Sequence, residues 1–476
     1  MPDQRVDVVV VGAGLGGLAL VRDLAARGVD VLALEASERP GGVAWTEARE
    51  GRLLETGPQR IRPSGAVRRL VSELGLEDRL LVSPGELPLY VYRDGRLGLV
   101  PLSAGELLRT DLLSAAGKLR LLAEPLTGGV RPGETVERYL ERKLGREAYL
   151  HLVGPLYGGL YGSDPSRMLV EESLGHILRR FGVGRSLGMA VLRMLGRRGQ
   201  ATPPATFFGG MAELPRAMAD AHRDRIRFGM RVTDLRREGG RWRVSAVRSD
   251  RDAAAAAGDG DRGSGGGASG TGEGAASAAE IEAGSVVVTV PAPEAAPLLR
   301  REAPAAAGGV GRLTYNRLVV VHLLAEGELE GLGCQVSLAE RGMATRGLTW
   351  NAAAFGPHPD APPAEREARE ARAGVHTSFL GGAGREDVAA MGDAEVARLA
   401  AAEFRRITGV PARPIMAGRV WMPAWDRSWV GIGGLELPAG LDVCAAWSER
   451  PGIPGRLDQA ARTAASIAGG GQRPAR

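Results

Sequence analysis

The sequence predicts an α/β fold in which a discontinuous Rossmann-like domain is combined with an α+β domain and an inserted helical domain. Two observations predict it. The chain begins with a βαβ unit whose first turn is rich in glycine. Buried-strand patterns return much later, over residues 286–291 and 441–446. One sheet is therefore assembled from distant segments, and the other domains lie between them.

The βαβ unit opens the chain. An unbroken apolar run over 6–11 predicts a buried parallel strand, and 18–27 continues as an amphipathic helix. Residues 31–34 predict the next strand, which ends at Glu35. The turn between the first strand and the helix reads G-x-G-x-x-G, so the unit matches the fingerprint of a dinucleotide-binding domain.

Each residue of this fingerprint has a physical task. Gly12 permits the tight turn, Gly14 lets the backbone approach a pyrophosphate, and Gly17 lets the helix pack closely on the strand. The helix N-terminus offers unpaired N–H groups to phosphates. Glu35 stands where it accepts hydrogen bonds from the adenosine ribose.

Composition bounds the class of protein. With 476 residues, 25% of them charged and 44% hydrophobic, the chain is long enough for two or three globular domains. It shows neither a signal-peptide pattern nor an apolar run of transmembrane length. Cys334 and Cys444 offer neither a disulfide framework nor metal spacing. We expect a cytoplasmic protein without a metal site.

Charge argues against one class of partner. The net charge of +5 is carried almost wholly by arginine, because Lys118 and Lys143 are the only lysines. The chain has no basic tail and no basic stripe interleaved with aromatic residues, so we do not expect nucleic-acid binding. Residues 189–195, with nearby arginines, are apolar on one side and basic on the other. Contact with a membrane surface and packing on the helical domain both remain open for them.

The middle of the chain contains a low-complexity stretch. Residues 249–280 are rich in Ala, Gly and Ser and predict a disordered loop between two strands. The domain division that we predict is 1–85, 206–300 and 426–476 for the dinucleotide-binding domain, 86–105 and 301–425 for the substrate domain, and 106–205 for the helical domain.

The stretch after Glu35 points to the cofactor. Arg39, Gly41 and Gly42 resemble the second phosphate loop of the FAD-dependent amine oxidase superfamily. This resemblance implies FAD, with the Arg39 side chain and the glycine amides facing its pyrophosphate. It also implies that the turn at Gly57 lies beside the flavin ring and that the backbone at Val232 contacts adenine.

The order of further motifs is more specific. It resembles the oxygen-dependent protoporphyrinogen oxidases and their coproporphyrinogen-oxidising relatives, from residue 6 to about 466. The segments that carry this resemblance are Tyr92-Arg93-Asp94-Gly95, 155–165, Phe208-Gly209-Gly210-Met211, 288–293 and Met422-Pro423-Ala424-Trp425.

The resemblance implies a reaction and substrate-binding residues. A porphyrinogen with propionate groups loses six electrons in three two-electron steps, each a hydride transfer to flavin and then to O2. The tetrapyrrole and O2 are thus the expected small-molecule partners; no catalytic acid or base is implied, because the flavin carries the chemistry. Arg93 would pair with a substrate carboxylate, and Phe355 would stack on a pyrrole ring. Gly159 and Leu332 would form pocket walls.

The last motif departs from the family pattern. Gly452 and Ile453 keep the register in which the chain touches the flavin, but Arg450 replaces a glycine and Gly455 replaces an acid. Two alternatives therefore stay open: another oxidoreductase of the superfamily, such as an amine oxidase or desaturase, and a degenerate flavoprotein without turnover. No lysine follows Lys143, which counts against amine oxidation. A homodimer also stays open.

Overall fold

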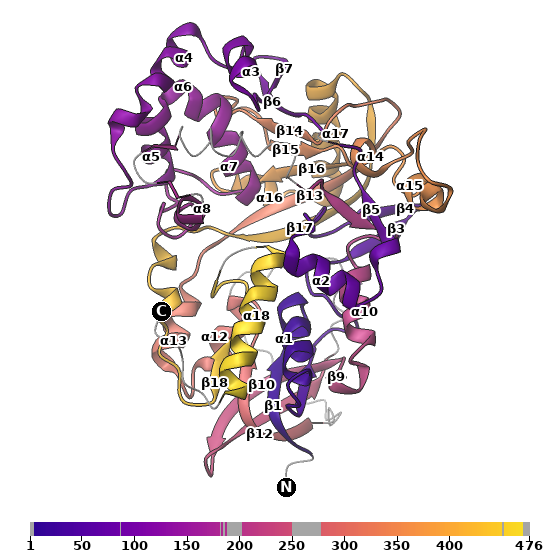
Figure 1. Ribbon diagram of the computed structural model, residues 1–476, viewed down its shortest axis with the longest axis vertical. Helices are drawn as coiled ribbons and strands as arrows, with labels where there is room; N and C mark the ends of the chain where they lie inside the picture. The colour runs from indigo at the N-terminus through magenta and orange to yellow at the C-terminus, as the bar shows by residue number, and fades with distance from the viewer. Residues whose placement is uncertain are drawn as a thin grey trace.

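The computed structural model describes residues 4–85, 87–180, 182–183, 186–187, 202–249, 278–449 and 452–469. Figure 1 shows two large sheets, one in each half of the molecule, with a group of helices beside the second sheet.

The first sheet gathers strands from distant parts of the chain. Its order is β10-β11-β12-β1-β2-β9. β11 and β18 pair with the same edge of β12, β11 along residues 278–283 and β18 along residues 286–288. β12, β1, β2, β9 and β18 pair in parallel, whereas β11 pairs antiparallel with both of its neighbours, β10 and β12. Their bounds are β1 (Gln4–Val11), β2 (Val31–Leu34), β9 (Ile226–Arg227), β10 (Met230–Glu238), β11 (Arg241–Arg248), β12 (Ala278–Val288) and β18 (Leu441–Val443).

Strand β1 is buried on both faces, which explains its unbroken run of valines. Val8 and Val10 pack with helices on one face, while Val9 and Val11 join the core on the other. The helices of the first face are α1 (Leu15–Ala25), α2 (Gly65–Glu73), α10 (Glu213–Asp220) and α18 (Ile453–Ala468), and α1 packs against α18 (Figure 1). Helices α12 (Ala292–Leu299) and α13 (Pro304–Gly311) share the core on the other face with Val9 and Val11.

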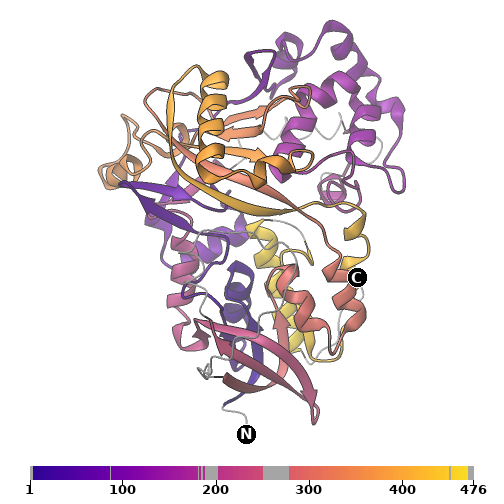
Figure 2. The same cartoon turned by 180° about the vertical axis from the view of Figure 1, so that it is seen from behind.

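The second sheet has the order β17-β13-β16-β15-β14-β6-β7. Its strands are β6 (Leu89–Arg93), β7 (Arg96–Leu99), β13 (Tyr315–Ala325), β14 (Gly333–Val336), β15 (Thr345–Thr349), β16 (Val375–Gly381) and β17 (Ala412–Pro423). Helix α17 (Asp393–Thr408) lies across one face and shares a core with Val319 and Val321 (Figure 2). Helices α7 (Gly154–Tyr161) and α14 (Asn351–Phe355) also contact the sheet.

Short elements complete the fold. Two small sheets pair β3 (Thr46–Arg49) with β4 (Arg52–Glu55) and β5 (Leu80–Val82) with β8 (Ala205–Phe207). The remaining α-helices are α3 (Ala104–Arg109), α4 (Ala115–Leu122), α5 (Val136–Leu144), α6 (Arg146–Ala148), α8 (Gly175–Arg180), α15 (Arg366–Glu370) and α16 (Glu386–Ala390). A π-helical turn, Tyr149–Val153, joins α6 to α7.

The predicted α/β class is confirmed. β6 and β7 form an antiparallel hairpin, in which Arg93 pairs with Arg96. One boundary was wrong: the loop expected over 249–280 ends earlier, because β12 starts at Ala278, which pairs with Val247 of β11. Residues 250–277 and 188–201, including the amphipathic stretch at 189–195, lie outside the described residues.

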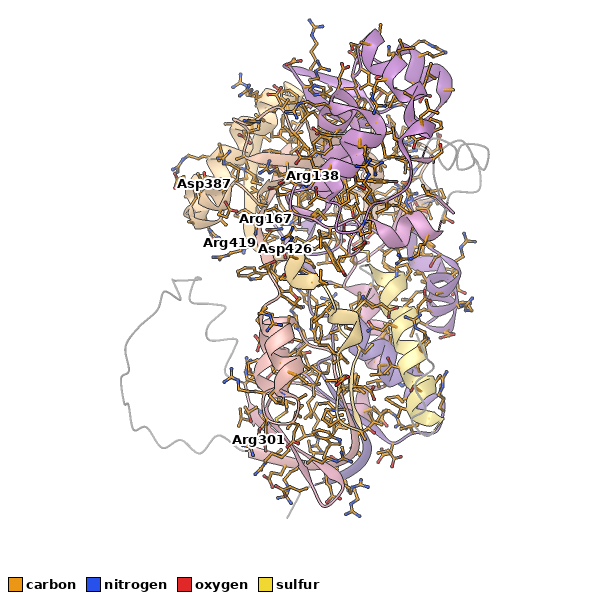
Figure 3. The ribbon with its side chains drawn as sticks, turned by 90° about the vertical axis from the view of Figure 1, so that its left-hand side faces the viewer. Arg138, Arg167, Arg301, Asp387, Arg419 and Asp426 are labelled. Atoms are coloured by element: carbon orange, nitrogen blue, oxygen red, sulfur yellow. The ribbon has the colours of Figure 1, made fainter. Side chains whose placement is uncertain are left out.

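Charged contacts join distant segments. Arg167 lies 3.6 Å from Asp426, so residues after α7 contact the segment after β17 (Figure 3). Asp426 also accepts hydrogen bonds from Ser428 and Thr314, and these bonds with the Arg167 charge lower its pKa although burial opposes them.

A second ion pair is fully buried among the helices. Lys143 Nζ lies 2.5 Å from Glu124 Oε1, and the two side chains are 0% and 2% exposed. Glu124 also accepts hydrogen bonds from Ser186 and Leu187, so the pair holds this later segment against α5.

We expect Lys143→Met to lower the free energy of unfolding by about 3–5 kcal/mol, because the Glu124 carboxylate would remain buried without its cation. Arg146→Met is the matched control, since Arg146 pairs with Glu141 but is 68% exposed, and its loss costs less than about 1 kcal/mol. Urea unfolding measures both variants, and equal effects would contradict the importance of the buried pair.

Candidate cofactor and substrate site

The first glycine-rich turn is built by close backbone packing. Gly12 has φ +104°, and a Cβ at Gly17 would lie 2.0 Å from Gly12 O. Thr289 Oγ1, just after β12, donates to Val11 O at 2.8 Å and to Gly12 O at 3.1 Å. A Cβ at Gly14 would meet no atom within 4 Å, so the helix N-terminus is open on that side.

A second glycine-rich turn lies directly beside the first. Gly41 N–H donates to Ala13 O at 2.9 Å, and Gly41 and Gly14 form a parallel bridge. Gly41 and Gly42 both have positive φ, at +96° and +58°. The structure therefore brings together two predicted phosphate loops that are about 25 residues apart in sequence.

Two arginines flank this turn around one aromatic ring. The Arg39 guanidinium lies 4.2 Å from the centre of the Trp45 ring, and Arg216 lies 4.3 Å from it. Arg39 Nη1 also donates to Gly42 O at 3.1 Å. Stacking on Trp45 thus positions the predicted phosphate-binding arginine.

Glu35 stands at the carboxyl end of β2, beside both turns. Its Oε2 accepts from Ala13 N–H at 2.7 Å and its Oε1 accepts from Ser37 N–H at 2.9 Å. Glu35 O accepts from Met230 N–H at 2.8 Å, which fixes the start of β10 near the acid. Val232, the predicted adenine contact, follows on the same strand and is buried.

The last helix starts close to α1. Gly452 has φ +92° and precedes the buried Ile453, the first residue of α18. Arg456 Nη1 donates to Ala445 O and to Gln459 Oε1, which ties α18 to the segment after β18. Gly455 lies within α18, whereas Arg450 lies outside the described residues.

These residues fit FAD. The open side of Gly14 leaves room for a pyrophosphate at the N-terminus of α1, and a second loop with positive-φ glycines lies against it. Glu35 lies where a ribose acceptor is needed, one strand away.

The turn at Gly57 is anchored by Glu55, a buried acid two residues before it. Glu55 accepts from Thr46 Oγ1 at 2.7 Å and from Met211 N–H at 3.1 Å. Burial raises the pKa of Glu55 to about 7, although these hydrogen bonds and the Arg372 charge oppose the shift. A Cβ at Gly57 would lie 1.8 Å from Val43 O, so this turn packs tightly on the segment after Gly42.

Two of the predicted substrate residues lie in one small apolar cluster. Leu332 and Phe355 pack with Leu81 and Phe208, and Phe355 is 3% exposed. Leu332 N–H donates to Pro88 O, so it lies next to the start of β6. The structure thus brings together residues that are far apart in the chain.

The other two predicted residues lie elsewhere. Arg93 is at the far end of β6, where Nε donates to Asp94 Oδ2 and Nη1 donates to Leu112 O, each at 2.9 Å. Gly159 belongs to α7 and packs on β14, since a Cβ there would lie 1.9 Å from Gln335 Oε1. Its position keeps α7 close to the second sheet.

Sequence reasoning missed several residues that position the site: Thr289, Trp45, Glu55 and Gln59. Thr289 and Gln59 lie in segments that the motifs marked, but their hydrogen bonds join residues more than 270 positions apart. These contacts are visible only in the tertiary structure.

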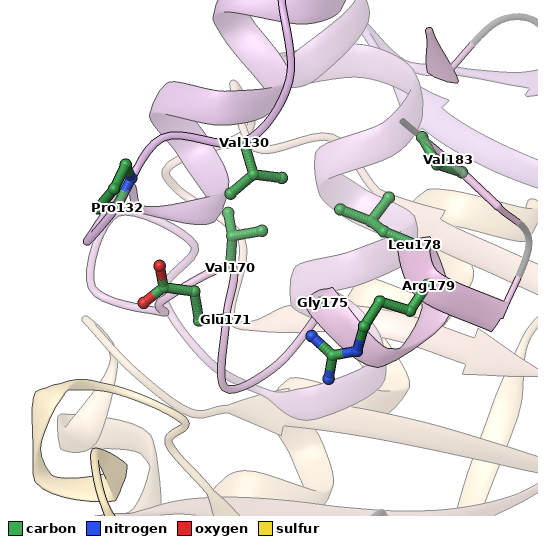
Figure 4. Close-up of a pocket in the computed structure, with 8 residues that line it drawn as sticks. All are labelled: Val130, Pro132, Val170, Glu171, Gly175, Leu178, Arg179 and Val183. Atoms are coloured by element: carbon green, nitrogen blue, oxygen red, sulfur yellow. The ribbon is translucent and has the colours of Figure 1, made fainter. Parts of the chain in front are cut away.

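A separate pocket of about 300 Å³ lies among the helices near α8. Val130, Val170 and Leu178 point toward one another inside it (Figure 4). It takes no residue from the two glycine-rich turns. In the described part of the chain, no group of three His, Cys, Asp or Glu side chains could hold a metal ion.

Comparison with known proteins identifies the family. The family described as flavin containing amine oxidoreductase matches residues 15–432. The chain belongs to this family. It is an FAD-dependent oxidoreductase.

The relatives include porphyrinogen-oxidising enzymes. The chloroplastic protoporphyrinogen oxidase of Oryza sativa subsp. japonica is 29% identical over 90% of this chain and 80% of its own length. The coproporphyrinogen III oxidase of Staphylococcus aureus is 29% identical over 36% of this chain and 42% of its own. A crystal structure from Exiguobacterium sp. 255-15, provisionally named a protoporphyrinogen oxidase, has a TM-score of 0.72 at 20% identity and covers 98% and 99% of the two chains. The likeness to that structure shows the fold.

The two glycines of the first turn give opposite predictions. We expect Gly17→Ala to destabilise the protein by about 1–3 kcal/mol, because its Cβ would overlap Gly12 O. Gly14→Ala has room in the protein, so its stability should change by less than about 0.5 kcal/mol while FAD affinity falls. Thermal unfolding and FAD titration measure these effects, and unchanged FAD affinity in Gly14→Ala would contradict the assigned phosphate site.

Glu55 makes stability depend on pH. The folded pKa of Glu55, about 7, lies above the ordinary value of 4.5, so the folded protein favours the protonated carboxyl. The stability that depends on this protonated form is fully present below pH 4.5 and is lost as pH rises through 7. This group alone lowers the free energy of unfolding by about 3 kcal/mol across that range. Glu55→Gln should remove that decline in urea unfolding followed from acid to neutral pH, and an unchanged pH profile would contradict a neutral Glu55.

Proposed function

We propose that this enzyme oxidises a porphyrinogen to the porphyrin with O2 as the final acceptor, in tetrapyrrole biosynthesis. The observation that carries the proposal is the layout of β6. The apolar cluster with Leu332 and Phe355 lies at one end of this strand, and Arg93 lies at the other. The strand rises four residues from Leu89 to Arg93, which is about 13 Å. This spacing suits a large apolar ring with carboxylate groups at its edge.

The proposed roles follow from this layout. Phe355 and Leu332 contact the macrocycle, and Arg93 binds a carboxylate. Gly159 keeps its predicted place in the pocket wall, where the absence of a side chain lets α7 lie close to Gln335 of β14. Bound FAD supplies a hydride acceptor. On the cofactor side, Glu35 binds the ribose. The pyrophosphate lies at the two glycine-rich turns, which contain Gly12, Gly14, Gly17, Arg39, Gly41 and Gly42. The site is completed by Gly57, Val232, Gly452 and Ile453.

The relatives support this substrate class. The chloroplastic protoporphyrinogen oxidases of Oryza sativa subsp. japonica and Nicotiana tabacum each match 90% of the chain, whereas the coproporphyrinogen III oxidases of Staphylococcus aureus and Propionibacterium freudenreichii match 36% and 39%. Protoporphyrinogen is therefore the first substrate to test. Amine oxidation is disfavoured because no lysine follows Lys143, where many amine oxidases use one near the flavin.

We expect Arg93→Ala to raise the KM for a porphyrinogen by roughly tenfold, because a charge-assisted contact is worth about 1.5–3 kcal/mol. Arg96→Ala is the matched control, since Arg96 pairs with Arg93 across the same hairpin and is exposed. Steady-state oxidation of the porphyrinogen by the FAD-loaded protein measures both. Equal KM values in wild type and Arg93→Ala would exclude the carboxylate role, and no oxidation by wild type would exclude the function.

We also propose a peripheral place on the cytoplasmic face of a membrane. No helix in the described residues could cross a bilayer. Leucines at 108, 119, 122 and 126 are 68–88% exposed on α3, α4 and the turn after α4. Helices α3 and α4 lie at the end of the molecule opposite β1 (Figure 1). Arg109 is exposed beside them, and Lys118 is half-buried. Exposed leucines flanked by cations fit an anionic lipid surface.

Paired substitution tests this surface. Leu119→Asp with Leu122→Asp should reduce sedimentation with phosphatidylglycerol vesicles at least about tenfold, because two leucines lose apolar burial worth about 1.5–3 kcal/mol each. Val430→Asp is the control, since Val430 is 60% exposed outside this surface. Undiminished sedimentation of the double variant, or none for wild type, would overturn the membrane proposal.

A further inference from the structure

Both the nitrogen and the oxygen of the Gln59 side-chain amide form hydrogen bonds. Its Nε2 donates to Glu55 O at 2.8 Å and to Gly57 O at 3.1 Å, which holds its own turn together. Its Oε1 accepts from Asn351 Nδ2 and from Thr377 Oγ1, each at 3.0 Å. The orientation of the amide is thus fixed, because the opposite one would place Oε1 against two carbonyl oxygens.

This orientation determines where a proton lies on His322. The single hydroxyl proton of Thr377 is donated to Gln59 Oε1, so the 3.2 Å contact between Thr377 Oγ1 and His322 Nδ1 requires His322 to donate. His322 is 1% exposed, and burial lowers its pKa to about 4. The ring is therefore neutral at physiological pH, with its proton on Nδ1.

The four side chains connect two parts of the molecule. Gln59 follows the turn at Gly57, and that turn is anchored by Glu55. Asn351 begins α14, which ends at Phe355, while Thr377 and His322 lie on the paired strands β16 and β13. Asn351, Thr377 and His322 are all at least nine-tenths buried. Hydrogen bonds in such a place are strong and costly to break.

We propose that Gln59, Asn351, Thr377 and His322 form a positioning network that sets the separation between the flavin turn at Gly57 and the substrate surface at Phe355. Its effect on turnover rests on the proposed function. None of the last three residues needs to touch the substrate, because Asn351 and Thr377 act through Gln59 and His322 acts through Thr377. Small displacements of reacting groups cost up to about a hundredfold in rate.

Thr377→Val tests the network, because it removes the hydroxyl and keeps the shape of the side chain. We expect kcat for a porphyrinogen to fall roughly tenfold, with little change in KM, and the reduction potential of the bound flavin to shift. Thr377→Ser keeps the hydroxyl and should restore both. Ser378→Ala is the matched control: Ser378 is 0% exposed and is the next residue of β16, with its hydroxyl 3.5 Å from Thr345 rather than in the network.

The histidine tautomer provides a readout that is independent of turnover. Nitrogen-15 correlation spectra of the FAD-loaded wild type should show one histidine with its proton on Nδ1 that does not titrate between about pH 5 and pH 8. His322→Asn should remove this signal and Thr377→Val should shift it. A proton on Nε2 of His322, or a Thr377→Val protein with an unshifted signal and an unchanged flavin potential, would overturn the network. If wild type oxidises no porphyrinogen, the proposed function fails, while these spectra and the potential still decide the network.

Discussion

The contact between Gly17 and Gly12 is the constraint on which the cofactor half depends. Because no side chain separates them, α1 starts directly over the end of β1. Its N-terminal amides therefore stand at the carboxyl edge of the first sheet. Glu35 and the second glycine-rich turn reach the same edge from β2, and Thr289 reaches it from β12.

A few polar contacts near Gly57 fix the second sheet relative to the first. The turn at Gly57 is held by Glu55 on the side of the first sheet and by Gln59 on the side of the second. Between these anchors the chain has little freedom, since Gly57 also packs against Val43 O. In the proposed function this arrangement matters, because the proposed cofactor residues lie at the first sheet and the proposed substrate residues at the second.

The helices contribute in a different way. Their interior contains the buried pair of Lys143 with Glu124, whereas their outer surface exposes leucines. A buried ion pair adds little stability but tolerates no loss of one partner. The exposed leucines are the feature that a globular fold alone does not explain.

The sequence by itself determined the local chemistry of this protein: the βαβ unit with Gly12, Gly14, Gly17 and Glu35, and the α/β class. These follow from periodicity and glycine spacing, which act over a few turns of chain. Tertiary structure decided which distant residues meet. The cluster of Leu332 with Phe355, the ring contacts of Trp45 and the Gln59 network depend on strand order and on hydrogen bonds across hundreds of residues. No local pattern encodes such contacts, because the same side chains satisfy many other neighbours equally well.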